Sequence, residues 1–322
     1  MNSAEKNILA IHDLSCFGRC ALTVIIPTLS SMSHQVTPLP SALLSTHTGG
    51  FTNMVFTDLT DKMKDSFDHM VESGAEFDAV YSGFLGNAGQ AEIVKYIIEK
   101  NPDALIMVDP VMGDGGELYQ TYTEEMKEAM CSLCYLADVI TPNLTEANFL
   151  LGETSFDISF DSRADAFKTA EDILSRLYKK YKTAHIALTG IEFYERIGEK
   201  SFPHTNIADN TESRTPSPNF KAYEKTDREK FAKYICTAAL SDGILSFNVN
   251  EFKGSEAGYP GTGDIFASVL LGKMLGGVSF SECAEAASAF VRDAVCDTAA
   301  HKTPVRNGVL LERNLYRLTE KR

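Results

Sequence analysis

Three glycines and one carboxylate stand directly before an apolar pattern in GYPGTGDIFASVLLGKMLGG, residues 258–277. Glycine lets the backbone turn sharply and leaves N–H groups unpaired, and these groups with the helix dipole attract anions such as phosphate. Because a carboxylate repels phosphate, Asp264 needs another explanation. It is either a helix N-cap, worth about 1 kcal/mol of helix stability, or a catalytic group. The apolar residues after it recur at helical spacing, which predicts a helix that begins at or just after Asp264.

Further polar or glycine-containing motifs follow apolar segments that we expect to be strands. They are HDLSCFGR, STHTGG, SGFLGNAG, VDPVMGDGG, TPNLTEAN and LTG. Ligands of a doubly wound sheet gather at the carboxyl ends of its strands, although polar loops with glycine also occur for turn reasons alone. Six such motifs along one sheet edge indicate a shared binding site.

The elements that must position these motifs alternate between strand and helix. Strands are expected at 8–12, 35–40, 77–86, 103–113, 138–143 and 184–190, and helices at 20–32, 59–74, 88–102, 124–137, 144–152 and 162–181. This alternation predicts βαβ units and a parallel sheet with helices on both faces.

The alternation breaks after Thr189. Residues 195–228 are polar, contain proline and lack periodicity, which predicts a long loop. Residues 234–252 are expected to form two strands joined by a turn at 241–243, and residues 279–300 a second amphipathic helix. No linker separates two independent cores, so residues 1–322 are expected to form a single α/β domain.

Composition limits the class of protein. With 322 residues and 44% hydrophobic content, the chain can bury a large core. The formal net charge of −14 argues against nucleic acid, since no basic stripe would neutralise phosphates. An anionic ligand would need local donors and a metal ion. The sequence has no apolar run near the ~20 residues of a membrane span and no secretory signal at its start, so we expect a cytoplasmic protein without a membrane partner.

The cysteines do not indicate a disulfide framework. Seven of them, an odd number, are scattered along the chain, as is typical of thiols in a reducing compartment. Cys131 and Cys134 form a C-x-x-C pair that could bind zinc or carry out redox chemistry. Cys134 shares a helical face with Met130 and Leu133, and no second pair of ligands is nearby. A packing role is therefore favoured over a metal site.

Four of the motifs carry a family resemblance. SGFLGN, VDPVMGD, ITPNLTEANFLLG and GTGDIFAS resemble the ribokinase-like superfamily of small-molecule kinases, and most closely its pyridoxal (pyridoxine, pyridoxamine) kinase branch. The resemblance runs from about residue 8 to about residue 295, and DPV-x-GD, TPN-x-x-E and GTGD in this order are highly specific. It implies a three-layer α/β sandwich with a mostly parallel sheet and a small β lid. It also implies ATP-dependent phosphorylation of a 5′-hydroxymethyl group in vitamin B6 salvage, by a homodimer.

The resemblance assigns a role to the glycine turn. Phosphoryl transfer depends on positioning and charge stabilisation, and a base must take the proton of the attacking alcohol. Asp264 matches the family's base. Gly261, Thr262 and Gly263 would offer their N–H groups to the transferring phosphoryl group, and metal ions with the helix N-terminus would offset the repulsion from the carboxylate.

Further family positions concern the nucleotide and its metal. The positions near ATP are matched by Asp109, Asp114, Asn143, Glu146 and Thr189. Asp109, Asp114 and Glu146 would also lie near Mg²⁺, which requires hard oxygen ligands. A monovalent cation such as K⁺ is a further possibility. Glu146 also fits the first turn of a helix, and Asp109 fits a hydrogen bond to backbone at a strand end.

The matching positions on the vitamin side are Asp13, His47, Thr48 and Phe84. An aromatic ring at Phe84 could stack on a pyridine ring. Pyridoxal kinases usually carry serine where Asp13 stands, whereas hydroxymethylpyrimidine kinases carry aspartate. Phe84 replaces a common tyrosine. A hydroxymethylpyrimidine kinase of thiamine synthesis and a non-catalytic B6-binding protein therefore remain alternatives, although a pure binder has no use for the base at Asp264.

Overall fold

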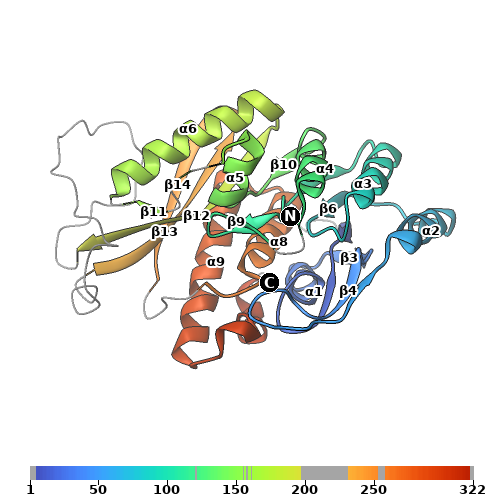
Figure 1. Cartoon of the computed structure of the whole chain (residues 1–322), viewed down its shortest axis with the longest axis horizontal. Helices are drawn as coiled ribbons and strands as arrows, with labels where there is room; N and C mark the ends of the chain where they lie inside the picture. The colour runs from blue at the N-terminus through green and yellow to red at the C-terminus, as the bar shows by residue number, and fades with distance from the viewer. Residues whose placement is uncertain are drawn as a thin grey trace.

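A computed structural model of the chain describes residues 5–119, 122–154, 156, 159–160, 162–196, 231–252 and 258–319. Within this part, a nine-stranded sheet lies between two layers of helices (Figure 1). The predicted three-layer arrangement with a mostly parallel sheet and a small β hairpin is thus confirmed.

The main sheet has the strand order β14-β13-β12-β10-β7-β6-β1-β3, with β11 paired to β12. The strands are β1 (Asn7–Ile11), β3 (Gln35–Pro38), β6 (Ala79–Ser82), β7 (Leu105–Val108), β10 (Val139–Ile140), β11 (Ser159–Phe160), β12 (His185–Arg196), β13 (Phe231–Ser241) and β14 (Ile244–Glu251). All pairings from β3 to β12 are parallel, and only β12–β13 and β13–β14 are antiparallel. The carboxyl ends of the parallel strands therefore meet at one edge, as the motifs predicted.

Two smaller sheets complete the β structure of the described residues. One contains β2 (Leu14–Phe17), β4 (Ala42–Thr46) and β5 (Phe56–Asp58), and the other contains β8 (Gly113–Asp114) and β9 (Glu117–Leu118). We did not predict these short strands, because their few residues give no clear alternation of apolar and polar positions.

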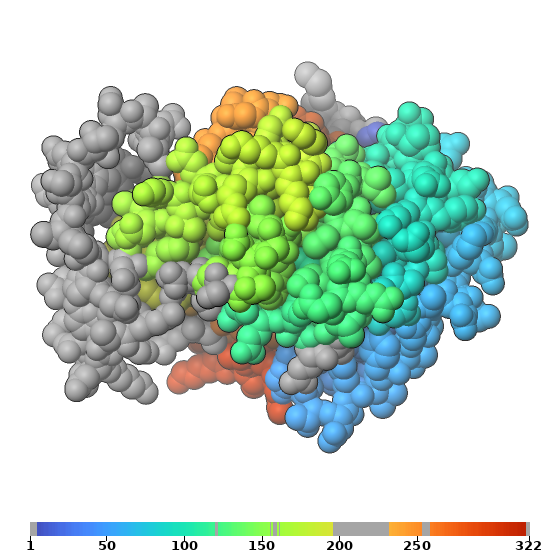
Figure 2. Space-filling view, turned by 45° about the horizontal axis from the view of Figure 1, so that its top comes forward, coloured from blue at the N-terminus to red at the C-terminus, as the bar shows by residue number. Residues whose placement is uncertain are grey.

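The helices form two groups. They are α1 (Leu22–Ser31), α2 (Thr60–Glu72), α3 (Gly89–Lys100), α4 (Glu124–Cys134), α5 (Leu144–Leu151), α6 (Arg163–Tyr181), α8 (Thr262–Leu275) and α9 (Phe280–Ala300), followed by 3₁₀ turns at Val305–Asn307, Leu311–Arg313 and Leu315–Arg317. Helices α2 to α6 pack on one face of the sheet, and α1, α8 and α9 pack on the other. Figure 2 shows the outer surface of the first group, from teal α3 to yellow-green α6, with the light-blue segment that contains α2 beside it.

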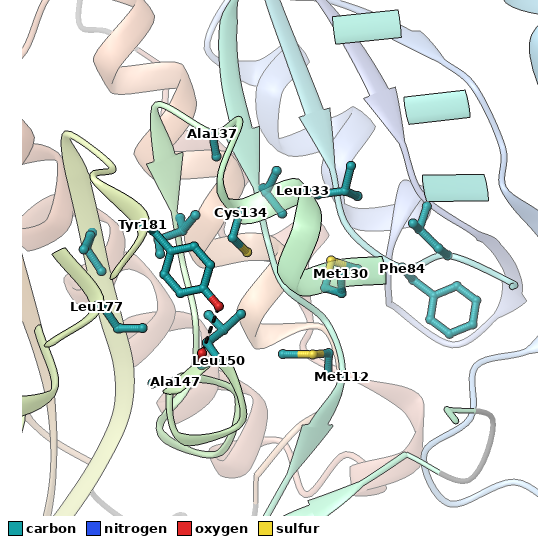
Figure 3. Close-up of a cluster of buried hydrophobic side chains, with 14 of the residues drawn as sticks. Phe84, Met112, Met130, Leu133, Cys134, Ala137, Ala147, Leu150, Leu177 and Tyr181 are labelled. Atoms are coloured by element: carbon teal, nitrogen blue, oxygen red, sulfur yellow. Dashed lines mark hydrogen bonds between the residues drawn. The ribbon is translucent and has the colours of Figure 1, made fainter. Parts of the chain in front are cut away.

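Each face of the sheet buries its own apolar cluster. Figure 3 shows part of the cluster under α2 to α6, where Cys134 packs beside Leu133 and the Tyr181 hydroxyl donates to the Leu150 carbonyl at 2.8 Å. Cys134 is fully buried, and Cys131 is partly buried against the same cluster. Burial raises the pKa of both thiols, which disfavours the thiolate that metals and oxidants require.

Three predicted placements are wrong in part. Helix α8 begins at Thr262, two residues before Asp264, with Gly261 as its N-cap. The motif STHTGG follows β4 of the three-stranded sheet and not a strand of the main sheet. Strand β12 continues through Arg196 because it pairs with β13, so residues 195–196 of the predicted loop are strand. Residues 197–228 of that loop lie outside the described residues.

None of the helices in the described ranges combines the length and the apolar character needed to cross a membrane.

Candidate active site

The site centres on the start of helix α8. The first helical hydrogen bond joins the Ile265 N–H to the Gly261 carbonyl at 3.0 Å. The three N–H groups before it, on Thr262, Gly263 and Asp264, have no partner within the helix and carry the positive end of its dipole. This arrangement can bind an anion such as a phosphoryl group.

Gly261 is required at this turn for two reasons. Its φ angle of +82° lies in the left-handed region that side chains disfavour. A Cβ atom at this position would stand 2.3 Å from the carbonyl oxygen of Arg19. The loop before α1 and the start of α8 therefore approach each other as closely as a glycine permits.

The loop before α1 also holds the Asp264 carboxylate. The Ala21 N–H donates to Asp264 Oδ2 at 2.8 Å, and Cys20 Sγ lies 3.5 Å from the same oxygen. Ala21 adopts φ 52° and ψ −134°, which is unusual for a residue with a side chain and marks local strain. Asp264 is thus not the N-cap of α8, since Gly261 holds that position and the Asp264 side chain bonds to another element. Burial raises the pKa of Asp264, and the Ala21 and Cys20 hydrogen bonds partly oppose this.

A second carboxylate, Asp13, follows strand β1. Its side chain is 6% exposed, and Ser15 Oγ donates to its Oδ2 at 2.7 Å. Burial raises the pKa of Asp13 to about 7; the Ser15 bond lowers it and the negative charge of Asp264 raises it further. Asp13 therefore lies near Asp264 and is partly protonated at neutral pH.

Asp109, at the end of β7, is the third buried carboxylate of the site. It is 5% exposed and accepts a hydrogen bond from Thr141 Oγ1 at 3.1 Å on its Oδ1. Burial and the charge of Asp264 raise the pKa of Asp109 to about 8. Asp13, Asp109 and Asp264 come from three separate segments, and the sheet brings them within electrostatic range.

Glu146 and Asn143 form the capping box of α5. The Asn143 side chain accepts from the Glu146 N–H at 2.9 Å, and Glu146 Oε2 accepts from the Asn143 N–H at 2.9 Å. The other Glu146 oxygen accepts from the Met112 N–H at 3.1 Å. Burial and the charge of Asp109 raise the pKa of Glu146. The helix-opening interpretation of Glu146 is confirmed, and its bonds tie α5 to the segment after Asp109.

The remaining nucleotide-side residues surround this capping box. Asn143 Nδ2 donates to the Gly113 carbonyl at 2.8 Å, and an isolated parallel bridge joins Asn143 to Thr189. Thr189 lies inside β12 and not at its end. The register between β12 and β13 shifts at this point of the strand. Asp114 is exposed, and its Oδ1 accepts from the Gly115 N–H at 2.8 Å.

The predicted metal ligands fit Mg²⁺ only in part. The described residues contain no preformed group of three or more metal-ligating side chains. Both oxygens of Glu146 accept backbone N–H groups, so Glu146 is not suited to direct ligation. Asp109 and Asp114 each use Oδ1 in a hydrogen bond, which leaves Oδ2 of each for a cation. This suits Mg²⁺, which typically takes one or two carboxylates together with phosphate oxygens and waters.

Of the residues that match the family's vitamin-side positions, His47 is bound within the protein. Its Nε2 donates to the Arg306 carbonyl at 2.8 Å, and its Nδ1 accepts from the Gly49 N–H at 3.0 Å. Burial lowers the pKa of His47. The ring therefore links the loop after β4 to the segment after α9. Thr48 is exposed beside it.

Phe84 belongs to the core more than to the site. Its side chain is 8% exposed and makes an edge contact with Tyr122, with ring centroids 6.1 Å apart. In Figure 3 it lies at the edge of the group of buried side chains drawn. Its ring would need to be uncovered before it could stack on a ligand.

Sequence reasoning missed the residues that hold Asp264. Cys20 and Ala21 precede α1, more than 240 positions earlier in the chain, and their residue types carry no chemical signal. Gly261 offered a faint one, since a Cβ there would lie 2.3 Å from the Arg19 carbonyl oxygen, in the loop that also contains Cys20 and Ala21. A glycine needed for close approach marks a contact but does not identify its partner.

The described residues form a mostly parallel sheet between helical layers. Carboxylates at the strand ends lie beside a helix that starts at a glycine turn. This arrangement is the ribokinase-like fold. Within that class, the chain belongs to the phosphomethylpyrimidine kinase family, whose model matches residues 5–201, more than half of its length.

Relatives of this chain include proteins named for vitamin B6. The pyridoxal kinase PdxY of Histophilus somni is 31% identical over 195 residues, which cover 58% of this chain and 65% of that protein. The chain thus spans about 65% of the length of such curated relatives. A candidate phosphomethylpyrimidine kinase from Bacteroides thetaiotaomicron, solved with pyridoxal, is 34% identical with a TM-score of 0.76, covering 98% of this chain and 96% of the other. Pyridoxal kinase from Lactobacillus plantarum is 28% identical with a TM-score of 0.73, covering 97% and 96%.

Proposed function

We propose that this protein is an ATP-dependent kinase that phosphorylates the 5′-hydroxymethyl group of pyridoxal, pyridoxine or pyridoxamine. The observation that carries this proposal is the placement of Asp264 beside the N–H groups that open α8 and have no partner within the helix. The naming of its relatives as pyridoxal kinases, and the pyridoxal in the Bacteroides structure, support this class of substrate.

In the proposed mechanism, Asp264 accepts the proton of the substrate hydroxyl while the alcohol oxygen attacks the γ-phosphorus of ATP and the bond to ADP breaks. The Ala21 N–H holds Oδ2 of the carboxylate, so Oδ1 is the acceptor. The N–H groups of Thr262 and Gly263 stabilise the charge on the transferring phosphoryl group.

Asp109 and Asp114 would hold Mg²⁺, while Glu146 and Asn143 position the segment that carries them. The metal, when bound, neutralises charge on the phosphates. Thr189 would border the nucleotide through its bridge to Asn143.

On the vitamin side, Asp13 would bind a ring substituent or ring nitrogen of the substrate, since its carboxyl can donate or accept near neutral pH. His47 and Thr48 would border the ring from the loop after β4, and Phe84 would do so from the loop after β6 once its buried ring is uncovered. The same Asp13 favours the second candidate function, a hydroxymethylpyrimidine kinase. A non-catalytic B6-binding protein is the third.

A substrate panel separates these candidates. Purified protein with Mg²⁺ and ATP is offered pyridoxal, pyridoxine, pyridoxamine and hydroxymethylpyrimidine, and ADP release is measured, with K⁺ present and absent. Phosphorylation of a B6 vitamer is expected. Turnover of hydroxymethylpyrimidine alone would establish the second function, and inertness toward all four would establish the third.

Asp264→Asn tests the base. We expect turnover to fall by about 10² or more, because loss of a general base removes that much, while ATP binding stays within a few-fold. ATP affinity is measured by calorimetry beside the kinetics. Near-normal turnover in this variant would refute the role of Asp264.

We also propose that the protein is a cytoplasmic homodimer. The support for a partner is a group of exposed apolar side chains on and beside the three-stranded sheet, of which Phe17 is 57% and Val55 is 67% exposed.

A further inference from the structure

His12, at the end of strand β1, is a buried polar side chain without a hydrogen-bond partner. Its exposed fraction is 0%, and within the described residues neither Nδ1 nor Nε2 has a donor or acceptor at bonding distance. A buried polar group left in this state typically destabilises a protein, because it has lost its hydrogen bonds to water without replacement. His12 belongs to the motif HDLSCFGR together with Asp13. The proposed mechanism uses Asp13 but not His12.

Two neighbours fix the orientation of the His12 ring. It makes an edge contact with the Tyr81 ring, with centroids 4.3 Å apart. It also fills the space beside Gly83, where a Cβ atom would lie 2.2 Å from His12 Cε1 and 2.4 Å from Nδ1. The ring is therefore held in place by packing, and glycine at position 83 is what admits it.

One ring nitrogen of His12, Nδ1, lies near the proposed base. His12 Nδ1 lies 4.0 Å from Asp264 Oδ1. Burial lowers the pKa of His12 to about 3, so the ring is neutral and this contact is not an ion pair. A neutral imidazole still carries one N–H, and in the Nδ1–H tautomer that N–H is on the nitrogen 4.0 Å from the Asp264 carboxylate.

The two oxygens of Asp264 have different surroundings. Oδ2 is held by the Ala21 N–H and lies near Cys20, whereas Oδ1 has His12 as its polar neighbour among the described residues. A carboxylate held at one oxygen can still rotate about its bond to Cβ. A second donor at Oδ1 would fix the plane of the carboxylate and stabilise its ionised form, which burial disfavours.

We propose that His12 is a positioning residue for Asp264: its Nδ1–H donates to Oδ1 once the carboxylate moves about 1 Å toward it, and this orients the base toward the substrate hydroxyl. This inference rests on the proposed function, because it requires Asp264 to be the base. The second lone pair of Oδ1 remains available to the alcohol.

Three variants separate the donor from the volume of the ring. His12→Asn retains an N–H donor at the position of Nδ1, His12→Gln moves that donor toward the position of Nε2, and His12→Leu removes it. With the substrate that the panel identifies, we expect His12→Leu and His12→Gln to lower kcat by about 10-fold to 100-fold with KM within about three-fold. His12→Asn should retain kcat within about five-fold. Thermal melts and ATP binding, which a positioning role leaves nearly unchanged, are measured on each variant.

Asp264→Asn is assayed beside them so that the two failures can be distinguished. An inactive Asp264→Asn with a fully active His12→Leu overturns the role of His12 alone. An equal loss in all three His12 variants, with raised KM, also overturns it, because such a loss follows from altered packing. An active Asp264→Asn refutes the role of Asp264 as the base. The positioning role of His12 is then refuted as well.

Discussion

Replacing Asp13 by asparagine should make the protein more stable at alkaline pH. The carboxyl is 6% exposed, and burial with the nearby charge of Asp264 raises its pKa from an ordinary 3.8 to about 7. At pH values between these two pKa values, Asp13 keeps its proton in the folded protein but has lost it in the unfolded chain. Since the unfolded chain binds fewer protons than the folded one, the free energy of unfolding falls as pH rises through this interval.

The magnitude follows from the pKa of Asp13. The interval from pH 5 to pH 7 covers two decades of proton concentration, and each decade changes the free energy of unfolding by about 1.4 kcal/mol for one fully bound proton. Above pH 7 the folded protein has mostly lost this proton, so the free energy of unfolding falls little further. Asp13 should therefore lower the stability of the wild-type protein by about 2–3 kcal/mol between pH 5 and pH 8. Asp13→Asn has no proton to lose, and its side-chain oxygen can still accept from Ser15 Oγ.

Urea unfolding at pH 5 and pH 8, followed by circular dichroism without ligands, measures this difference. The loss of stability between the two values should be about 2–3 kcal/mol smaller in Asp13→Asn than in the wild type. Asp65→Asn is the matched control, because Asp65 is exposed on α2 and the substitution changes the net charge equally. Parallel pH dependence of the wild type and Asp13→Asn would refute the reasoning.

Two further predictions concern the turn before α8 and the small sheet. Gly261→Ala should lower the free energy of unfolding by about 2 kcal/mol or more in urea titrations, because its Cβ would lie 2.3 Å from the Arg19 carbonyl at a positive φ. Gly258→Ala, whose Cβ would have no atom of the described residues within 4 Å, should change it by less than about 0.5 kcal/mol. Equal stability of the two variants would contradict the close approach. Val55→Glu should convert the proposed dimer to a monomer in light scattering, while Val71→Glu on the exposed face of α2 should not; a wild-type monomer would remove the proposal.

The amino-acid sequence was sufficient to predict most of the layered fold. Strands such as β6 and β7 are short apolar runs, and helices such as α2 and α6 have apolar residues at helical spacing, so each pattern indicates its own element. The two antiparallel strands β13 and β14 and the turn between them were also predicted correctly.

The predictions failed where an element depends on a partner far away in the chain. β2 and β4 are too short to show a pattern and exist because they pair with each other. β12 extends through Arg196 because β13 pairs with it along that length. Helix α8 begins at Thr262 because Gly261 adopts a left-handed conformation, which local periodicity does not reveal.

For the site, the sequence alone determined which side chains could take part. The glycine turn, its aspartate and the acidic motifs at strand ends are local patterns, and their chemistry follows from residue type. Only the tertiary structure decided that Ala21 holds Asp264, that His12 faces its other oxygen and that Glu146 is committed to backbone N–H groups. The reason is physical: hydrogen bonds and pKa values depend on burial and on neighbours brought together by folding, and these are not encoded within any single stretch of the chain.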